Sequence, residues 1–170
     1  MIFYLVMPVL YGGIGNYMVP VYQGTSEVGF PRTNGSSLLV LVPVSLAYIL
    51  VSVCMEYPGG TGWTLYPPLA LTLPTPTGTM VTILALVSNG WSSVLGSINF
   101  YSTVGSMQCP GLTLGYLYLL PVGVSILFLL LLMVLPVLTG ALGTLVSDTY
   151  SIGTRTTNAI VVTGTLVSIV

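Results

Sequence analysis

The sequence contains very little charge. Of its 170 residues, two are basic and three are acidic, so charged residues make up 3%, whereas a soluble domain carries about 25%. Apolar residues make up 54%, which is too much apolar surface for a chain that stays disordered in water. The composition excludes a soluble globular domain and a disordered chain. It predicts an integral membrane protein.

Histidine and lysine are absent altogether. Their absence excludes an imidazole metal ligand, a histidine general base, a Schiff-base lysine and a phosphate-binding loop lysine. The net charge of -1 and the lack of a basic cluster give nucleic-acid binding no electrostatic basis. We therefore expect no nucleic-acid partner and no self-contained enzyme.

The two cysteines, Cys54 and Cys109, are far apart in the sequence. They form neither a Cys-x-x-Cys pair nor a zinc-binding spacing. We interpret both as small, buried apolar residues that form no disulfide.

Four long uncharged runs dominate the chain. About 20 helical residues are needed to cross a hydrocarbon core of about 30 Å. The runs cover residues 1–22, 37–55, 79–107 and 114–146. They predict an all-α membrane protein with about four transmembrane helices, of which the fourth is long enough to tilt or to extend past the core.

Prolines and glycines lie inside these runs, among them Pro8, Pro43 and Pro136. Membrane helices tolerate both residue types, because neighbouring helices and hydroxyl groups satisfy the freed backbone groups. Small residues also allow close helix contact. We expect the helices to pack against other protein on several sides.

The ends of the chain are less regular than its middle. The first run begins at residue 1 without the layout of a signal peptide, so we expect a helix whose beginning is missing or is supplied by another chain. Residues 151–158 are polar, and the β-branched run at 159–170 is short for a membrane span. The state of residues 151–170 stays open.

Five segments occur in an order that identifies a family. They are MPVLYGGIGNYMVP (7–20), GFPRTNGSS (29–37), GTGWTLYPPL (60–69), SSVLGSINF (92–100) and LPVLTGALGTLVSD (135–148). Together they resemble subunit I of cytochrome c oxidase, the heme–copper oxygen reductase of respiratory chains. The resemblance covers residues 1–150 and matches helices II–V of that twelve-helix subunit. Residues 151–170 depart from it and lack the expected His-Pro-Glu-Val motif.

This resemblance implies a component of the catalytic subunit of respiratory complex IV, which reduces oxygen to water and pumps protons. The implied cofactors are haem a, haem a3 and copper, ligated by histidines outside this chain. The implied partners are the remaining part of subunit I, subunits II and III, the lipid bilayer, and cytochrome c as electron donor. The implied location is the mitochondrial inner membrane, with a bacterial plasma membrane as the alternative.

The resemblance also assigns residues to a proton path. Glu27 matches a carboxylate, usually aspartate, at the mouth of a proton channel; otherwise it is a solvated loop residue. Asn16, Asn34 and Asn99 match asparagines that organise water, and an amide both donates and accepts hydrogen bonds. The alternative for these amides is hydrogen bonding between helices, or a turn at Asn34.

Three further residues are assigned in the same way. Ser92 and Ser93 match hydroxyl groups farther along the path, although serines within helices often bond their own backbone carbonyls. Trp63 matches a donor to a propionate of haem a3, and its alternative role is an anchor at the membrane interface. Asp148 marks a membrane boundary and is assigned no other role.

Composition alone permits other functions. The chain could be a non-catalytic multispanning membrane scaffold or a transport subunit. It could also be a truncated or degenerate copy of an oxidase subunit. Haem in the purified assembly and the intact mass of the chain distinguish these alternatives.

Overall fold

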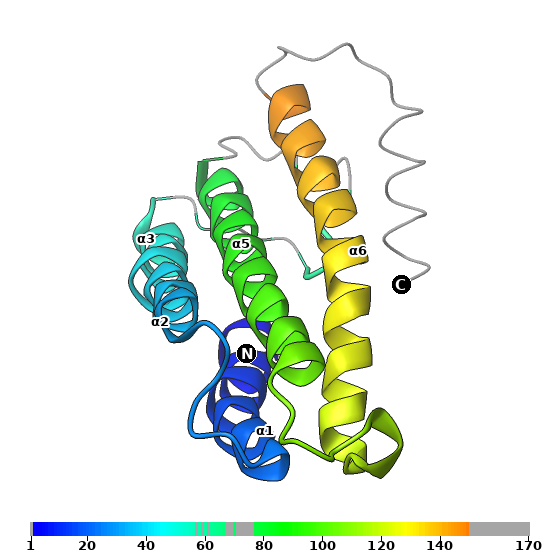
Figure 1. Ribbon diagram of the computed structural model, residues 1–170. Coiled ribbons are helices and arrows are strands. Elements are labelled where there is room, and N and C mark those ends of the chain that lie inside the picture. The colour runs from blue at the N-terminus through cyan, green and yellow to red at the C-terminus, as the bar shows by residue number, and fades with distance from the viewer. Residues whose placement is uncertain are drawn as a thin grey trace. The chain divides into compact units, whose positions relative to one another are not determined.

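The computed structural model describes residues 2–56, 58, 60, 62–66, 70 and 77–149, and all regular secondary structure in them is helical (Figure 1). Four of its segments are long and apolar enough to cross a membrane. They are Ile2–Gln23, Pro31–Cys54, Thr77–Ser106 and Leu119–Ser147. The predicted all-α class and the four predicted spans are thereby confirmed. The tail at 151–170 lies outside the described residues.

The first two spans alternate between π-helical and α-helical winding. The first consists of η1 (Ile2–Val6), η2 (Val9–Gly15) and α1 (Asn16–Gln23). The second consists of α2 (Pro31–Leu39), η3 (Val40–Ser45) and α3 (Leu46–Cys54). Proline removes an N–H donor and crowds the carbonyl four residues earlier. Pro8 directly precedes η2 and Pro43 lies within η3, so wide π turns accompany these two prolines. Such local changes of winding let a membrane helix tolerate proline.

The last two spans are long α-helices. Helix α5 (Thr77–Ser106) has 30 residues and α6 (Leu119–Thr149) has 31. At about 1.5 Å per residue, each is about 45 Å long, which exceeds the hydrocarbon core. Helix α6 begins later than the predicted run at residue 114, because the short 3₁₀ helix η4 (Leu114–Tyr116) precedes it.

The chain forms two compact units, and the first combines Met1–Pro43 with Asn89–Leu135. Its core contains Val19, Phe100, Val104 and Phe128. The rings of Phe100 and Phe128 stack with centroids 4.8 Å apart. A side chain at Gly15 would place its Cβ 3.2 Å from the Phe100 ring, so glycine lets the first span approach α5 closely.

The second unit combines Val44–Ser88 with Pro136–Val170. Its described core includes Met80, Ile83 and Leu142. Ser45 Oγ donates to the Ala85 carbonyl at 3.1 Å, and Ser52 Oγ donates to the Gly78 carbonyl at 2.8 Å. Hydroxyl groups on one face of the second span therefore tie it to the backbone of α5, as expected for helices that associate in lipid.

Many large apolar side chains are exposed on the described helices, for example Leu39, Leu50 and Met133. Such surfaces face lipid or other protein when the chain is in a membrane.

The cysteine prediction is wrong in one respect. Cys54 is exposed, whereas Cys109 is partly buried, and both thiols are free. Cys54 lies two residues after Ser52, which is about 200° around the helix, so it points away from the face that contacts α5.

Replacing Phe128 tests the core of the first unit. Phe128→Ala leaves a cavity beside Phe100 and Tyr11, whose ring centroid lies 5.3 Å from that of Phe128. We expect a loss of about 3 kcal/mol in the free energy of unfolding, measured by denaturant titration in mixed detergent micelles. The control is Leu129→Ala, because Leu129 is 39% exposed and should cost less than about 1 kcal/mol. Equal losses in the two variants would contradict this packing.

Candidate functional site

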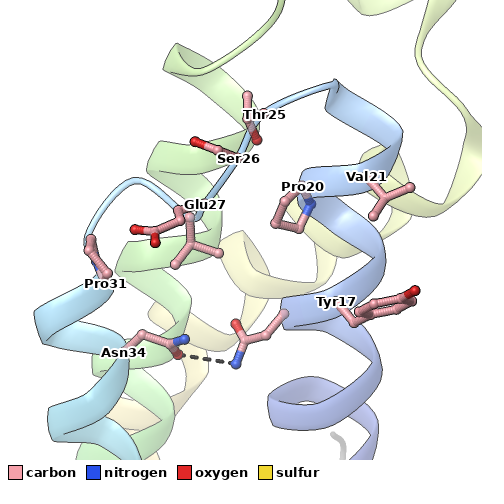
Figure 2. Close-up of a pocket in the computed structure, with 10 residues that line it drawn as sticks. Tyr17, Pro20, Val21, Thr25, Ser26, Glu27, Pro31 and Asn34 are labelled. Carbon is pink, nitrogen blue, oxygen red and sulfur yellow. Dashed lines mark hydrogen bonds between the residues drawn. The ribbon is translucent and has the colours of Figure 1, made fainter.

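The first unit contains an open cavity of about 380 Å³ where α1, α2 and their connector meet (Figure 2). Polar side chains from all three segments line it, together with apolar ones. The polar residues are Asn16, Tyr17, Thr25, Ser26, Glu27 and Asn34. Figure 2 shows Glu27 on the connector side of the cavity and Asn34 on the helix side.

Local sequence fixes both ends of the connector. Helix α1 ends at Gln23 and is followed by Gly24, whose φ of 69° lies in the left-handed region. Glycine adopts that conformation without strain. Helix α2 begins with Pro31, whose missing N–H would have no partner in the first turn. Glu27 lies between these two signals and its side chain is exposed.

Two of the predicted amides are hydrogen-bonded to each other. Asn16 Nδ2 donates to Asn34 Oδ1 at 3.3 Å and to the Gly12 carbonyl at 2.7 Å. The backbone N–H of Asn16 donates to the Gly13 carbonyl, so it is the side chain of Asn16, and not its backbone, that binds the Gly12 carbonyl. Asn16 Oδ1 is buried and has no partner among the described residues. A buried water molecule beside the pair would satisfy this acceptor.

The third predicted amide, Asn99, lies on α5 and is fully buried. Its Oδ1 accepts a hydrogen bond from the Phe30 N–H at 3.0 Å. Its Nδ2 is buried without a partner among the described residues. An unsatisfied buried donor costs about 1–3 kcal/mol, so this amide also favours a bound water molecule. Asn99 contacts the connector and is not part of the cavity lining.

The two predicted serines differ from each other. Ser93 Oγ donates to the Asn89 carbonyl of its own helix at 3.0 Å, which is the ordinary role of a serine within a helix. Ser92 Oγ donates to the Ser37 carbonyl of α2 at 2.7 Å. Both hydroxyl protons are therefore used, and the oxygen atoms keep lone pairs that can accept from water.

Trp63 belongs to the second unit and is 82% exposed. It lies in the connector between α3 and α5, and the structure does not bring it together with the other predicted residues within one unit. The side chain of Asp148 lies outside the described residues.

Sequence reasoning missed two residues that contact the connector region. Gln23 is 1% exposed and its Nε2 donates to the Val104 carbonyl at 3.3 Å. Thr103 is fully buried and its Oγ1 accepts from the Gly29 N–H at 2.9 Å. Thr103 follows Asn99 by four residues, so both lie on one helix face. That spacing was the available signal.

The arrangement combines a titratable carboxylate with neutral groups that bind water. An exposed carboxylate borders an open cavity, and neutral amides that can order water lie behind it. Among the residues that the structure describes, no group of three or more His, Cys, Asp or Glu residues could hold a metal ion.

Comparison with known proteins places this site in context. Three curated relatives named cytochrome c oxidase subunit 1, from Plasmodium berghei, Plasmodium chabaudi and Plasmodium falciparum, are each 43% identical to the chain over 150 residues. Each alignment covers 87% of this chain and 31% of the relative. The chain thus spans about a third of the length of the relatives it matches.

The profile of the family described as Cytochrome C and Quinol oxidase polypeptide I matches residues 1–168. This match also includes most of residues 151–170, for which the sequence analysis found no resemblance. The predicted division of the chain into residues 1–150 and 151–170 therefore stays a prediction. Because the match covers nearly the whole sequence, the chain belongs to the cytochrome c and quinol oxidase polypeptide I family.

Proposed function

We propose that the chain is part of the catalytic subunit I of cytochrome c oxidase, in which oxygen is reduced to water and protons are pumped. In this proposal the chain supplies part of the wall of the haem pocket and the lower part of a proton path. The supporting observation is the cavity that Glu27, Asn16 and Asn34 line together. The chain spans about a third of its relatives, and we propose that it acts only within the assembled subunit.

Glu27 is the proposed entry point for protons. Its exposed carboxylate takes a proton from water and releases it into the cavity. Asn16 and Asn34 then order water, because their amides donate and accept without themselves ionising. The unpartnered Oδ1 of Asn16 supplies an acceptor for a water molecule beside the cavity. Nδ2 of Asn99, which lies outside the cavity lining, supplies a donor for a separate buried water molecule.

The proposed path continues along α5. Ser92 precedes Asn99 by seven residues, so the two lie on the same face of the helix, about 10 Å apart along its axis. Ser93 is the next residue in the sequence after Ser92 and precedes Asn99 by six residues. Their oxygen atoms can accept hydrogen bonds from a chain of water molecules.

The proposed cofactors are haem a, haem a3 and copper, held in the assembled subunit by residues outside this chain. The chain contains no histidine, which supports placing the ligands outside it, so we derive no step through these metals. Trp63 is the proposed contact with a haem a3 propionate. Its indole N–H is a donor only, and its exposure leaves it accessible to a partner.

The proposed partners are the remaining part of subunit I, oxidase subunits II and III, and the lipid bilayer. Cytochrome c donates electrons to the complex. The exposed apolar side chains of all four spans support contact with lipid and other helices. We propose the mitochondrial inner membrane as the location. The remaining part of subunit I is either a separate polypeptide or a continuation of this one.

Purification of the native complex tests the proposed function as a whole. We expect a redox difference spectrum with a haem a band, copper by elemental analysis, and a co-purifying sequence that carries the histidine ligands. Peptide mass spectrometry must find this chain in the same particle. A particle without haem and without such a sequence would instead indicate a membrane scaffold or a transport subunit.

Replacing Glu27 tests the proposed entry point. Glu27→Gln removes the ionisable group and should lower the rate of proton uptake about tenfold or more, measured with a pH indicator in the purified complex. Glu27→Asp keeps the carboxylate and should retain most of the rate.

The matched control is Glu56→Gln, because Glu56 is also exposed but belongs to the second unit. We expect proton uptake in this variant to equal that of the wild type. A normal rate in Glu27→Gln, or an equal decrease in both variants, would refute entry at Glu27.

A further inference from the structure

The connector that carries Glu27 is hydrogen-bonded to α5 and to the loop after it on both sides of Glu27. On the N-terminal side, Gln23 Nε2 donates to the Val104 carbonyl and Cys109 Sγ donates to the Gly24 carbonyl, each at 3.3 Å. These two contacts fix the end of α1 and the first residue of the connector.

On the C-terminal side, two side chains of α5 accept hydrogen bonds from consecutive backbone N–H groups. Gly29 N–H donates to Thr103 Oγ1 at 2.9 Å, and Phe30 N–H donates to Asn99 Oδ1 at 3.0 Å. Thr103 and Asn99 are one helical turn apart, which lets them meet adjacent residues of the connector. Only residues 25–28 lie between the contacts at Gly24 and Gly29.

The Thr103 hydroxyl is oriented by its own helix. Its proton is donated to the Asn99 carbonyl at 2.7 Å, so its oxygen can only accept from Gly29. The side chain is fully buried, and both partners are backbone groups. This hydroxyl is therefore committed to holding the connector, and it is not accessible to a chain of water molecules.

Glycine makes this close contact possible. A Cβ at Gly29 would lie 3.4 Å from Thr103 Oγ1 and 3.4 Å from Met107 Sδ. A Cβ at Gly24 would lie 2.9 Å from Cys109 Sγ. The connector backbone therefore lies directly against α5 and the following loop on both sides of Glu27.

We infer that Thr103 is a positioning residue for Glu27: by binding the Gly29 N–H, it keeps the connector in the place where the carboxylate borders the cavity. This inference rests on the proposed function, because it assigns Glu27 the entry of protons. Thr103 does not touch Glu27 and acts through the backbone two residues later.

Three variants of the full chain in the purified complex test the inference. Thr103→Val keeps the shape and removes the acceptor, while Thr103→Ser keeps the acceptor. Ser102→Ala is the matched control, since no hydrogen bond joins Ser102 to the connector among the described residues. The first measurement is hydrogen–deuterium exchange of the peptide that contains residues 24–30. We expect exchange at least about fivefold faster in Thr103→Val, and wild-type exchange in the other two variants.

The second measurement is proton uptake, compared in the same preparations with Glu27→Gln. We expect a slower rate of proton uptake in Thr103→Val and recovery of the rate in Thr103→Ser. The loss of a hydrogen bond that serves only the fold would leave the rate of proton uptake unchanged. Thr103→Ala removes the same acceptor without adding a methyl group. It should behave like Thr103→Val and decides the question if the valine variant does not assemble.

The outcomes separate the inference from the proposed function. If exchange is unchanged in both the valine and the alanine variants, the inference is overturned. It is also overturned if exchange accelerates but proton uptake does not change, while Glu27→Gln still slows uptake; the proposed entry point then stands. If Glu27→Gln itself has no effect on uptake, the proposed entry point and the positioning role both fail.

Discussion

In the interior of a bilayer, every backbone N–H and C=O must find its hydrogen-bond partner within the protein. This constraint governs a chain with almost no charged side chains, because hydroxyl and amide groups are then the main side-chain partners. Each unit uses them in the same way. Ser52 binds a carbonyl of α5 in the second unit, and Ser92 of α5 binds a carbonyl of α2 in the first. Helix α5 thus takes part in contacts between helices in both units.

The same constraint explains why amides form the candidate site. A charged side chain within the hydrocarbon region is costly, whereas an amide can be satisfied by a backbone carbonyl and still retain a free donor or acceptor. Asn16 binds the Gly12 carbonyl and Asn34, and its Oδ1 remains without a partner among the described residues. The groups that stabilise helix contacts are therefore also the groups that can hold water.

Much of the fold was predictable from run lengths. Uncharged runs of about 20 residues or more predicted the four spans, because the thickness of the bilayer sets a minimum length. The π turns η2 and η3 were not predictable in detail, since proline shows where winding changes but not how. Cys54 was predicted to be buried and is exposed. The prediction was wrong because small apolar residues are usually buried in soluble proteins, whereas a membrane helix also presents them on its outer surface.

The candidate site was predictable only in part. The positions of Glu27, Asn16 and Asn34 came from resemblance, and the structure places all three around one cavity; their functional roles stay predictions. Thr103 was missed because its importance depends on the approach of Gly29, which lies 74 residues away in the sequence. The four-residue spacing of Asn99 and Thr103 placed them on one helix face, but it did not report this contact. A buried threonine reads as ordinary packing until the backbone N–H that it binds is known.

The contacts of α5 connect folding to the proposed path. A carboxylate on a free loop would sample many positions, and ordering a loop costs conformational entropy. Here that cost is offset by hydrogen bonds that the connector N–H groups donate to Thr103 and Asn99, whose own positions follow from one turn of a continuous helix. Asn99 does both tasks at once: its Oδ1 holds the connector while its Nδ2 remains a buried donor. Because one side chain serves both, the position of the connector that carries Glu27 and one of the places where water would be ordered are set by the same helix face.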